Sequence, residues 1–382
     1  LVGVDADAVN RYKDGVVARL YRGLRGLVKA SGVAYIEGEG LLSPAGTVEV
    51  DGRSVNARHV VLATGSAPRR LPGVETGGVV VTSDQAITLD RVPSRAVIIG
   101  GGVIGVEFAS IYRSLGAQVT VVEALERLVP VEDEDVSVAL GRAFVKRGIA
   151  IHTGVRVTGV QQEGARASVE LSDGQSLEGD LVLVALGREP VSHGLGYAAA
   201  GVGMEGGFVL TDERLRTAVD GIFAAGDIVP GPQLAHRGFA HGIFVAEEVA
   251  GLAPVPVRDH GIPRVTYCDP EIVSVGLTEQ QVRQEHGGAQ AQQHSLAGNG
   301  KSQILGTNGF VKVVRARPDG PVLGVHMIGA RLAEQAGEAQ LIVNWEALPD
   351  EVASLVHAHP TQNEALGEAH LALAGKPLHS HA

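Results

Sequence analysis

Two stretches of this sequence combine residue types and spacings that can do chemistry, and the first is a glycine-rich turn. An apolar run at 97–99 leads into Gly100-x-Gly102-x-x-Gly105 and then into a predicted helix. Gly100 allows a tight turn, Gly102 lets the backbone approach a pyrophosphate, and Gly105 lets helix and strand pack closely. The pyrophosphate would bind the free N–H groups at the start of that helix. The pattern predicts a dinucleotide-binding site.

An acidic residue completes this pattern. Glu123 ends the next apolar strand, 18 residues after Gly105. A carboxylate at that place can accept hydrogen bonds from both ribose hydroxyls and repels a 2′-phosphate, which favours NAD over NADP. Glycine clusters also make ordinary strand-to-helix turns, but strand, glycines, helix, second strand and acid all stand here at the required spacing. We therefore expect NAD binding.

The second stretch, His357–Glu364, precedes the last apolar helix. A carboxylate five residues after His359 can orient its ring and raise its basicity, as a general base requires. The same residues fit a capping box, in which Thr361 starts the helix and Glu364 bonds the backbone instead. Two histidines at i and i+2 could also suggest a metal, but no third ligand is placed, so we predict no metal site. Taken alone, these local residues favour the capping box.

A further candidate site follows two other apolar strands. Thr64-Gly65-Ser66 comes after the run at 60–63, and Gly226-Asp227 comes after the run at 222–225. Ligands of open α/β sheets bind beyond the carboxyl ends of the strands, so Asp227 could accept hydrogen bonds from the hydroxyls of a second cofactor. The same side chains could instead cap turns. Spacing does not decide between the two.

Three single residues have an ordinary structural explanation. His236 could contact a cofactor or cap the helix that follows it, and the sequence leaves both open. Cys268 is the only cysteine and lies on a predicted strand, where a small buried hydrophobe is favoured over a nucleophile. We expect Trp345 to pack in an interface or in the core.

Composition excludes several classes of protein. A chain of 382 residues is long enough for two or three domains with proper cores. The net charge of −11, with both signs interspersed, argues against a nucleic-acid partner. No apolar run approaches the ~20 residues that a membrane span needs. A single cysteine cannot form an intrachain disulfide, which fits a reducing compartment. We expect a cytoplasmic protein that does not enter a membrane.

The chain must also supply the elements that position these residues. Residues 97–211 alternate between predicted strands and helices, which implies a parallel sheet covered on both faces. From about residue 263, strands come first and helices later, as in an α+β module. A helix at 11–31 and a hairpin around Asp51-Gly52 precede both. The other expected elements are strands at 60–63, 181–186, 222–225, 264–267, 310–314 and 322–328 and helices at 331–346, 350–357 and 362–374.

Taken together, these motifs resemble the flavoprotein disulfide reductase family, and within it the dihydrolipoyl dehydrogenases. The resemblance runs the whole length of the sequence. It rests on Ala63–Ser66, Gly100–Glu107 with Glu123, Leu186–Arg188 with Pro190, Ala225–Asp227, Gln233–His236, Tyr267–Gly276 and His357–Glu364. The ending at 373–382 is similar to that of actinobacterial members.

The resemblance implies an α/β fold with two Rossmann-like nucleotide-binding domains, one for FAD and one for NAD, and a C-terminal α+β dimerisation domain. The residues implied to hold FAD are Thr64, Gly65, Ser66, Asp227, Gln233, Leu234, Ala235 and His236. Those implied to bind NAD are Gly100, Gly101, Gly102, Val103, Ile104, Gly105, Val106, Glu107, Glu123, Val157 and Gly187.

The resemblance also implies the catalytic groups and the partners. His359, held by Glu364, would be the acid/base and would reach the active site of the other subunit of a homodimer. This places the catalytic pair above the capping box as our preferred interpretation. The implied activity is the oxidation of dihydrolipoyl groups, and the implied partner is the lipoyl-bearing acyltransferase of a 2-oxoacid dehydrogenase complex.

The sequence departs from the family in one respect. The family begins with its own FAD-binding glycine fingerprint followed by a redox-active cysteine pair, and neither is present here. We therefore expect an N-terminally truncated sequence, inactive by itself. Its expected parts are the remaining FAD domain at 1–93, the complete NAD domain at 94–212, a returning segment at 213–260 and the dimerisation domain at 261–382. The alternatives are another reductase of the family and a dimeric NAD-binding scaffold without redox chemistry.

Overall fold

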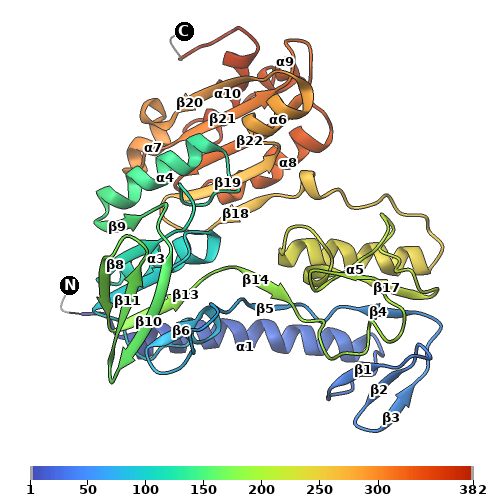
Figure 1. Ribbon diagram of the computed structural model, residues 1–382. Helices are drawn as coiled ribbons and strands as arrows, with labels where there is room; N and C mark the ends of the chain where they lie inside the picture. The colour runs from blue at the N-terminus through green and yellow to red at the C-terminus, as the bar shows by residue number, and fades with distance from the viewer. Residues whose placement is uncertain (1–2, 380–382) are drawn as a thin grey trace. The chain divides into compact units, whose positions relative to one another are not determined.

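The computed structural model describes residues 3–379, so the last three residues of the ending noted above lie outside the described part. The chain divides into two compact units. Unit 1 contains the described residues up to 69 together with 87–92 and 188–259, and unit 2 contains 70–86, 93–187 and the described residues from 260 onward. Figure 1 traces the chain through both. The domain boundaries at 93, 212 and 260 stay predictions.

Unit 1 begins with the predicted amphipathic helix, α1 (Ala6–Ala30), which starts where the Asp5 side chain accepts a hydrogen bond from the N–H of Ala8. The predicted hairpin is confirmed, because Asp51 and Gly52 both adopt the positive φ that a tight two-residue turn favours. The other elements of unit 1 are β1 (Gly40–Leu42), β2 (Val48–Val50), β3 (Arg53–Val55), β4 (Val60–Leu62), β5 (Ser66–Pro68), β14 (Arg188–Pro190), β15 (Met204–Glu205), β16 (Phe208–Val209), β17 (Ile222–Ala224) and α5 (Ala235–Val249).

Two strand pairs bring distant parts of unit 1 together. β4 pairs in parallel with β17, and β5 pairs antiparallel with β14. A core that includes Leu62, Ala224, Ile228 and Phe244 fixes these pairs. The residues that follow β4 and β17 therefore lie side by side, as the prediction for the two strand ends requires.

Unit 2 contains a parallel sheet with the strand order β6-β13-β7-β8-β9, and this confirms the predicted sheet. Its central strands are almost fully buried; Ile98 is 0% exposed, as expected for a strand covered on both faces. The elements are β6 (Val80–Thr82), α2 (Ser83–Ala86), β7 (Arg95–Ile99), α3 (Val103–Ser114), β8 (Gln118–Val122), α4 (Glu134–Lys146), β9 (Ile149–His152) and β13 (Leu181–Val184).

The predicted strand–helix alternation is wrong between β9 and β13. This stretch forms a three-stranded antiparallel meander of β10 (Val157–Glu163), β11 (Arg166–Leu171) and β12 (Ser176–Gly179). Along β11, Ala167, Val169 and Leu171 are buried at every second position and pack on the apolar side chains of the parallel sheet. A period of two residues is the signature of a strand with one covered face, and it was present in the sequence.

The last part of unit 2 is the expected α+β module, with an antiparallel sheet in the order β18-β19-β22-β21-β20. Helices α8 and α10 pack on this sheet, and α4 contacts it at β22 (Figure 1). The elements are β18 (Arg264–Thr266), β19 (Glu271–Gly276), α6 (Glu279–His286), β20 (Gln290–Ser295), α7 (Gly300–Leu305), β21 (Phe310–Arg315), β22 (Val322–Gly329), α8 (Ala336–Asn344), α9 (Pro349–Ala353) and α10 (Glu364–Leu373).

Three local predictions in this module need correction. Helix α9 ends at Ala353 rather than at 357, because the following residues form the loop that carries His359. Cys268 lies just after β18 and not on a strand. Trp345 is 76% exposed at the end of α8, which excludes the core, while the interface stays a prediction.

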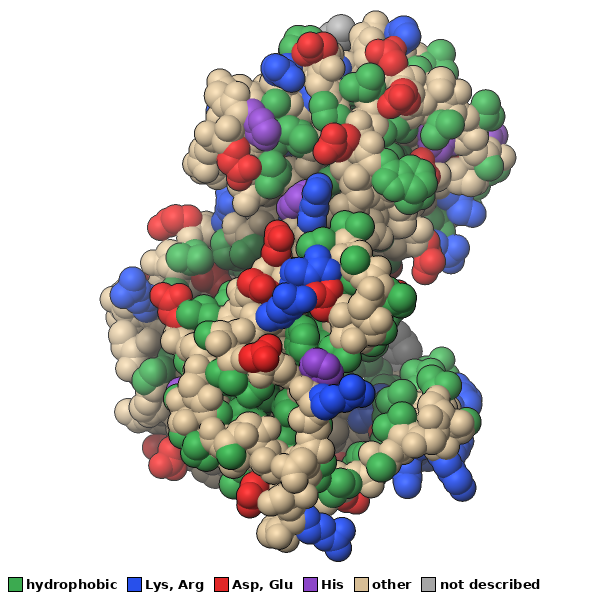
Figure 2. Space-filling view, turned by 90° about the vertical axis from the view of Figure 1, so that its right-hand side faces the viewer, with side chains coloured by type: hydrophobic (Ala, Val, Ile, Leu, Met, Phe, Trp, Pro, Cys, Tyr) green, Lys and Arg blue, Asp and Glu red, His purple; other side chains and the backbone are tan. Residues whose placement is uncertain are grey.

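The surface carries both signs of charge. Figure 2 shows acidic and basic side chains next to one another over the face in view. Within residues 3–379, no helix has the length and apolar character needed to cross a membrane.

Candidate functional site

The glycine-rich turn has the geometry of a nucleotide cradle. A Cβ on Gly105 would lie 1.9 Å from the carbonyl oxygen of Gly100, and a Cβ on Gly100 would lie 2.3 Å from that of Ala185. Neither position can hold a side chain without moving backbone. A Cβ on Gly102 would meet nothing within 4 Å, so the backbone there faces open space. The geometry of the three glycines therefore agrees with the separate roles predicted for them from the sequence.

Helix α3 starts at this turn with its first N–H groups unoccupied by a capping side chain. Its N-cap residue is Gly102, which has no side chain to cap the helix. The exposed N–H groups and the positive end of the helix dipole suit a pyrophosphate. The turn thus fits the phosphates of a dinucleotide.

The Glu123 carboxylate lies directly beside the turn. One oxygen accepts a hydrogen bond from the N–H of Gly101 at 2.7 Å, and the other accepts from the N–H of Leu125 at 2.8 Å. These two bonds fix the orientation of the carboxylate, whose remaining lone pairs can accept hydrogen bonds from ribose hydroxyls. The structure therefore brings the predicted acid to the predicted glycines.

Two other residues expected at the NAD site lie near the same sheet. Gly187 follows the end of β13, and β13 pairs in parallel with β7, which leads into Gly100. Val157 is half-buried at the start of β10 and packs on the apolar cluster that contains Ile99 and Val122. Whether either of them contacts NAD stays a prediction.

The pair His359 and Glu364 is formed in the loop before α10. Nδ1 of His359 lies 2.8 Å from Oε1 of Glu364, while Oε2 of Glu364 accepts a hydrogen bond from the N–H of Thr361 at 2.8 Å. One carboxylate oxygen thus bonds His359 and the other bonds the backbone, but the predicted capping box does not form. The N-cap of α10 is Asn363, without a side-chain capping bond, and the Thr361 hydroxyl donates to the carbonyl oxygen of Ala358 at 2.6 Å. The His359 side chain is 76% exposed, so Nε2 is available to a substrate.

The electrostatics of Glu364 suit its role beside a base. Burial would raise the pKa of Glu364, but the hydrogen bonds from Thr361 and His359 outweigh it and hold the pKa below its usual value. The carboxylate therefore stays ionised beside His359, where it can stabilise an imidazolium.

A second His–Glu pair supports this loop, and the sequence did not predict it. Nε2 of His357 lies 3.0 Å from Oε1 of Glu338 on α8, and Asn363 donates to the other oxygen of Glu338 at 2.6 Å. The hydrogen bond from His357 is the main reason why the pKa of Glu338 is lowered. Glu338 thus fixes both sides of the loop that presents His359. Glu338 is 19 residues from His357 in the sequence, so no local motif links the two residues.

In unit 1, the residues after β4 and β17 meet as predicted. Ser66 donates a hydrogen bond to Asp227 at 2.5 Å, and Arg188 donates to the Ser66 hydroxyl at 2.7 Å. Thr64 donates to the carbonyl oxygen of Val191. These polar groups bond one another, as the turn-capping alternative expects, yet they also gather in one place. Asp227 keeps acceptor capacity for the hydroxyls of a second cofactor.

The start of helix α5 lies beside this cluster. Gln233 donates to the carbonyl oxygen of Asp227 at 3.3 Å, and a Cβ on Gly226 would lie 3.8 Å from Cα of Gly238 on α5. The N-cap residue Leu234 makes no side-chain capping bond, so the helix start can serve an anionic group. Ala235 and His236, the first residues of α5, are exposed. The residues present therefore fit the phosphates and hydroxyls of FAD.

Cys268 does not belong to a reactive site. It is buried, and burial with the nearby Glu107 carboxylate raises its pKa to about 12. A thiol with that pKa stays protonated at neutral pH and is a poor nucleophile. The interpretation as a small buried hydrophobe is confirmed. Over the described residues there is no cluster of three His, Cys, Asp or Glu that could hold a metal ion.

Comparison with known proteins identifies the family. The model of the pyridine nucleotide-disulphide oxidoreductases matches residues 3–242, and the model of their dimerisation domain matches 262–370. The chain belongs to the pyridine nucleotide-disulphide oxidoreductase family. It is an oxidoreductase whose cofactors are FAD and NAD. The expected α/β fold with a C-terminal dimerisation domain is confirmed.

The similar proteins include several dihydrolipoyl dehydrogenases. That of Chlorobaculum tepidum is 37% identical over 95% of this chain and 80% of its own length. That of Bacillus subtilis is 35% identical over 99% of this chain and 84% of its own length. The crystal structure of LpdA from Mycobacterium tuberculosis has a TM-score of 0.90 at 27% identity, over 97% of this chain and 84% of that one. The flavoprotein disulfide reductase RclA of Escherichia coli shares the fold, with a TM-score of 0.86 at 24% identity.

Proposed function

We propose that this protein is a dihydrolipoyl dehydrogenase, which oxidises the two thiols of a dihydrolipoyl group to a disulfide and passes the two electrons to NAD. The observation that carries the proposal is the pair His359–Glu364, an exposed imidazole held through Nδ1 by an ionised carboxylate. A thiol is a substrate for such a base, because its nucleophilic form is the thiolate. The names of the similar proteins support the same substrate class.

The residues of this chain have distinct roles in the proposal. His359 accepts the thiol proton at Nε2, and Glu364 keeps Nδ1 protonated and stabilises the resulting positive charge. Gly100–Gly105 and Glu123 bind and orient NAD. Thr64–Ser66, Asp227 and Gln233–His236 hold FAD. FAD and NAD supply the two-electron carriers when they are bound.

One component of this chemistry is not among the 382 residues. Transfer of electrons from a dithiol to flavin through exchange requires a redox-active cysteine pair, and this sequence contains a single cysteine that is buried. These residues alone are therefore expected to bind nucleotides without turning over dihydrolipoamide. The proposed activity therefore requires a redox-active cysteine pair that these residues do not supply.

The dimerisation-domain match supports a homodimer. We extend this to a site in which His359 serves the active site of the second subunit, and to a lipoyl-bearing acyltransferase of a 2-oxoacid dehydrogenase complex as partner. A cytoplasmic location agrees with the single unpaired cysteine and completes the proposal.

The direct test of the base is His359→Ala in the holoenzyme. We expect turnover with dihydrolipoamide and NAD to fall by about two to four orders of magnitude, since general-base catalysis contributes that much. Bound flavin and NAD affinity should not change, because His359 lies in neither nucleotide site.

The chain offers a matched control for this variant. Nδ1 of His379 also lies 2.8 Å from a carboxylate oxygen, that of Glu368 on α10, and the His379 side chain is 73% exposed. His379→Ala should leave turnover within about twofold, as a solvated surface pair contributes little. Equal losses in the two variants, or full activity in both, would contradict the role of His359.

A further inference from the structure

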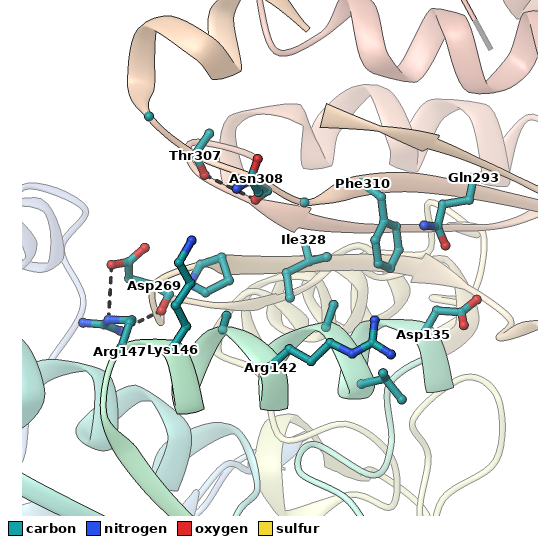
Figure 3. Close-up of a pocket in the computed structure, with 16 residues that line it drawn as sticks. Asp135, Arg142, Lys146, Arg147, Asp269, Gln293, Thr307, Asn308, Phe310 and Ile328 are labelled. Carbon is teal, nitrogen blue, oxygen red and sulfur yellow. Dashed lines mark hydrogen bonds and ion pairs between the residues drawn. The ribbon is translucent and has the colours of Figure 1, made fainter. Parts of the chain in front are cut away.

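Unit 2 contains a groove that the proposed reaction does not use. It has a volume of about 650 Å³ and lies between helix α4 and the strands β20, β21 and β22 (Figure 3). A volume of this size is typical of sites for small organic molecules. The groove shares no residue with the glycine turn or with the His359 loop.

One wall of the groove is the outer stripe of α4. Val138, Arg142 and Lys146 follow each other at helical spacing on this stripe and line the groove. The opposite stripe of α4, with Leu140 and Phe144 both 0% exposed, packs in the core. Burial of this one face is therefore enough to hold α4 in the fold. It does not explain the residue types on the stripe that faces the groove.

The charge on this wall is not compensated. Arg142 and Lys146 are both exposed, and neither makes an ion pair within the described residues, although they stand at i and i+4, where like charges repel. The helix dipole explains a cation in the last turn, at Lys146. It does not explain Arg142 one turn earlier.

The acidic side chains that line the groove are already engaged. Asp135 accepts a hydrogen bond from Lys312 at 2.6 Å, and Asp269 pairs with Arg147 at 3.6 Å. The Arg147–Asp269 pair is drawn at one end of the groove in Figure 3. Lys312 also pairs with Asp133 and Glu279, so the residues that line the groove carry three positive and two negative charges, a net charge of +1, in a chain whose net charge is −11. A local positive potential on an acidic protein favours a small anion.

The other walls of the groove are apolar with a few amide groups. The buried Phe310 and Ile328 form the floor of the groove opposite α4, Pro270 beside them is half-buried, and Val138 on α4 is 43% exposed. The Gln293 and Asn308 side chains are exposed at the rim and offer hydrogen-bond donors. Figure 3 shows Arg142 and Lys146 on α4 below, with Phe310, Ile328 and Gln293 on the strands above.

We propose that this groove binds a small organic anion, with its carboxylate or phosphate between Arg142 and Lys146 and an apolar body against Val138 and Ile328. Guanidinium and ammonium groups form charge-assisted hydrogen bonds with either kind of anion. The apolar surface selects against inorganic ions, because its burial rewards only a ligand that carries hydrocarbon. The site is separate from dihydrolipoyl oxidation, so it stands whether or not that activity is found.

The test is calorimetric titration of the NAD-saturated holoenzyme with four probes: 2-naphthoate, 2-naphthyl phosphate, acetate and inorganic phosphate. Saturation with NAD blocks the nucleotide site in unit 2. We expect one of the two naphthyl probes, or both, to bind with one-to-one stoichiometry and at least about tenfold more tightly than the matching probe without the ring. The tighter naphthyl probe identifies the natural anion as a carboxylate or as a phosphate.

Variants locate the binding. The double substitution Arg142→Glu with Lys146→Glu should weaken the naphthyl probe by at least about tenfold, since hydrogen bonds to charged groups contribute about 1.5–3 kcal/mol each. Val138→Gln should weaken the naphthyl probe and leave its ring-free counterpart unchanged. Arg166→Glu, at an exposed position on β11 outside the groove, is the control and should have no effect.

Three results would overturn the proposal. The first is that no probe binds. The second is that acetate or phosphate binds as tightly as its naphthyl counterpart, which would mean a simple patch of charge. The third is that the Arg142/Lys146 double variant and the Arg166 control bind equally well, which would place the binding elsewhere.

Discussion

The two regions expected to bind nucleotides differ in how they are built. In unit 2, the NAD cradle is made of backbone: three glycines, the start of α3, and a carboxylate that is itself held by two backbone N–H groups. In unit 1, the region expected to hold FAD is made of side chains from separate segments, and Ser66, Asp227 and Arg188 bond one another. A backbone cradle is complete within a short stretch of chain. A side-chain cluster forms only when the separate segments that carry its residues pack together.

The two regions also differ in how deeply the elements around them are buried. The strands behind the NAD cradle are buried, with Ile98 at 0% exposure. In unit 1, helix α1 has no buried residue, and Leu20, Leu24 and Leu27 on its apolar face are 59–70% exposed. The described residues therefore complete the NAD region and leave part of unit 1 uncovered. We expect substitutions to act through backbone fit in the first region and through hydrogen bonding in the second.

The largest effect is expected for Gly105→Ala. Its Cβ would lie 1.9 Å from the carbonyl oxygen of Gly100, so helix and strand would have to separate. We expect a loss of about 3 kcal/mol in the free energy of unfolding of unit 2 and loss of NAD binding, measured by denaturant unfolding and by titration. Gly141→Ala on α4 is the control, because its Cβ would meet nothing within 4 Å; it should stabilise the helix by up to about 1 kcal/mol. Equal behaviour of the two variants would refute the backbone account.

Glu123→Arg should change the preference between the two nicotinamide nucleotides. The substitution removes the acceptor for the ribose hydroxyls and adds a partner for a 2′-phosphate. We expect the ratio of NAD to NADP affinity to fall by about a hundredfold, since hydrogen bonds to charged groups contribute about 1.5–3 kcal/mol each. Glu123→Gln keeps the size and should change the ratio less. An unchanged ratio in both variants, measured by fluorescence titration, would exclude contact between Glu123 and ribose.

The sequence predicts a region well when its residues are adjacent in the chain and poorly when they come from separate segments. The glycine turn was predictable because its strands, helix and acid are adjacent in the chain. The pair of β4 and β17 was recognisable only as two strands with polar ends, because their pairing joins segments about 160 residues apart in sequence. Glu338 was missed because it reaches His357 only after α8 packs on the sheet. The meander was missed because the strand–helix alternation of the preceding residues predicted a helix between β9 and β13, where the chain forms three short strands.

A fall in pH should destabilise unit 1 through His241. His241 accepts a hydrogen bond at Nδ1 from the N–H of Gly226, beside Asp227, and burial followed by the charge of Arg237 lowers its pKa to about 4. An unfolded histidine has a pKa near 6.5. This hydrogen bond therefore contributes fully above pH 6.5 and is lost as the pH falls toward 4.

Between pH 7 and pH 5 we expect the free energy of unfolding of unit 1 to fall by about 1 kcal/mol through this group, because the unfolded chain takes up a proton at His241 that the folded protein still excludes. Denaturant unfolding at each pH, followed by flavin release, measures this fall. His241→Asn keeps an acceptor and does not titrate, so its stability should vary less with pH. A pH dependence as steep as that of the native protein would show that another group is responsible.

The smallest effect is expected for Asp227→Asn. The amide oxygen still accepts hydrogen bonds, but without the charge that makes them stronger. We expect FAD affinity to fall by about fivefold while NAD affinity stays constant, as measured by flavin fluorescence during titration. A parallel loss of NAD affinity would mean that the two regions are not independent.

The most direct test of the proposed function is steady-state NADH formation by the FAD-loaded protein purified from its native source and shown to contain a redox-active cysteine pair, with dihydrolipoamide and with glutathione as alternative thiol donors. Dihydrolipoamide should support NADH formation at least about a hundredfold faster than glutathione, with loss of that activity in His359→Ala. NAD binding without NADH formation from dihydrolipoamide would contradict the proposal and favour a dimeric NAD-binding scaffold.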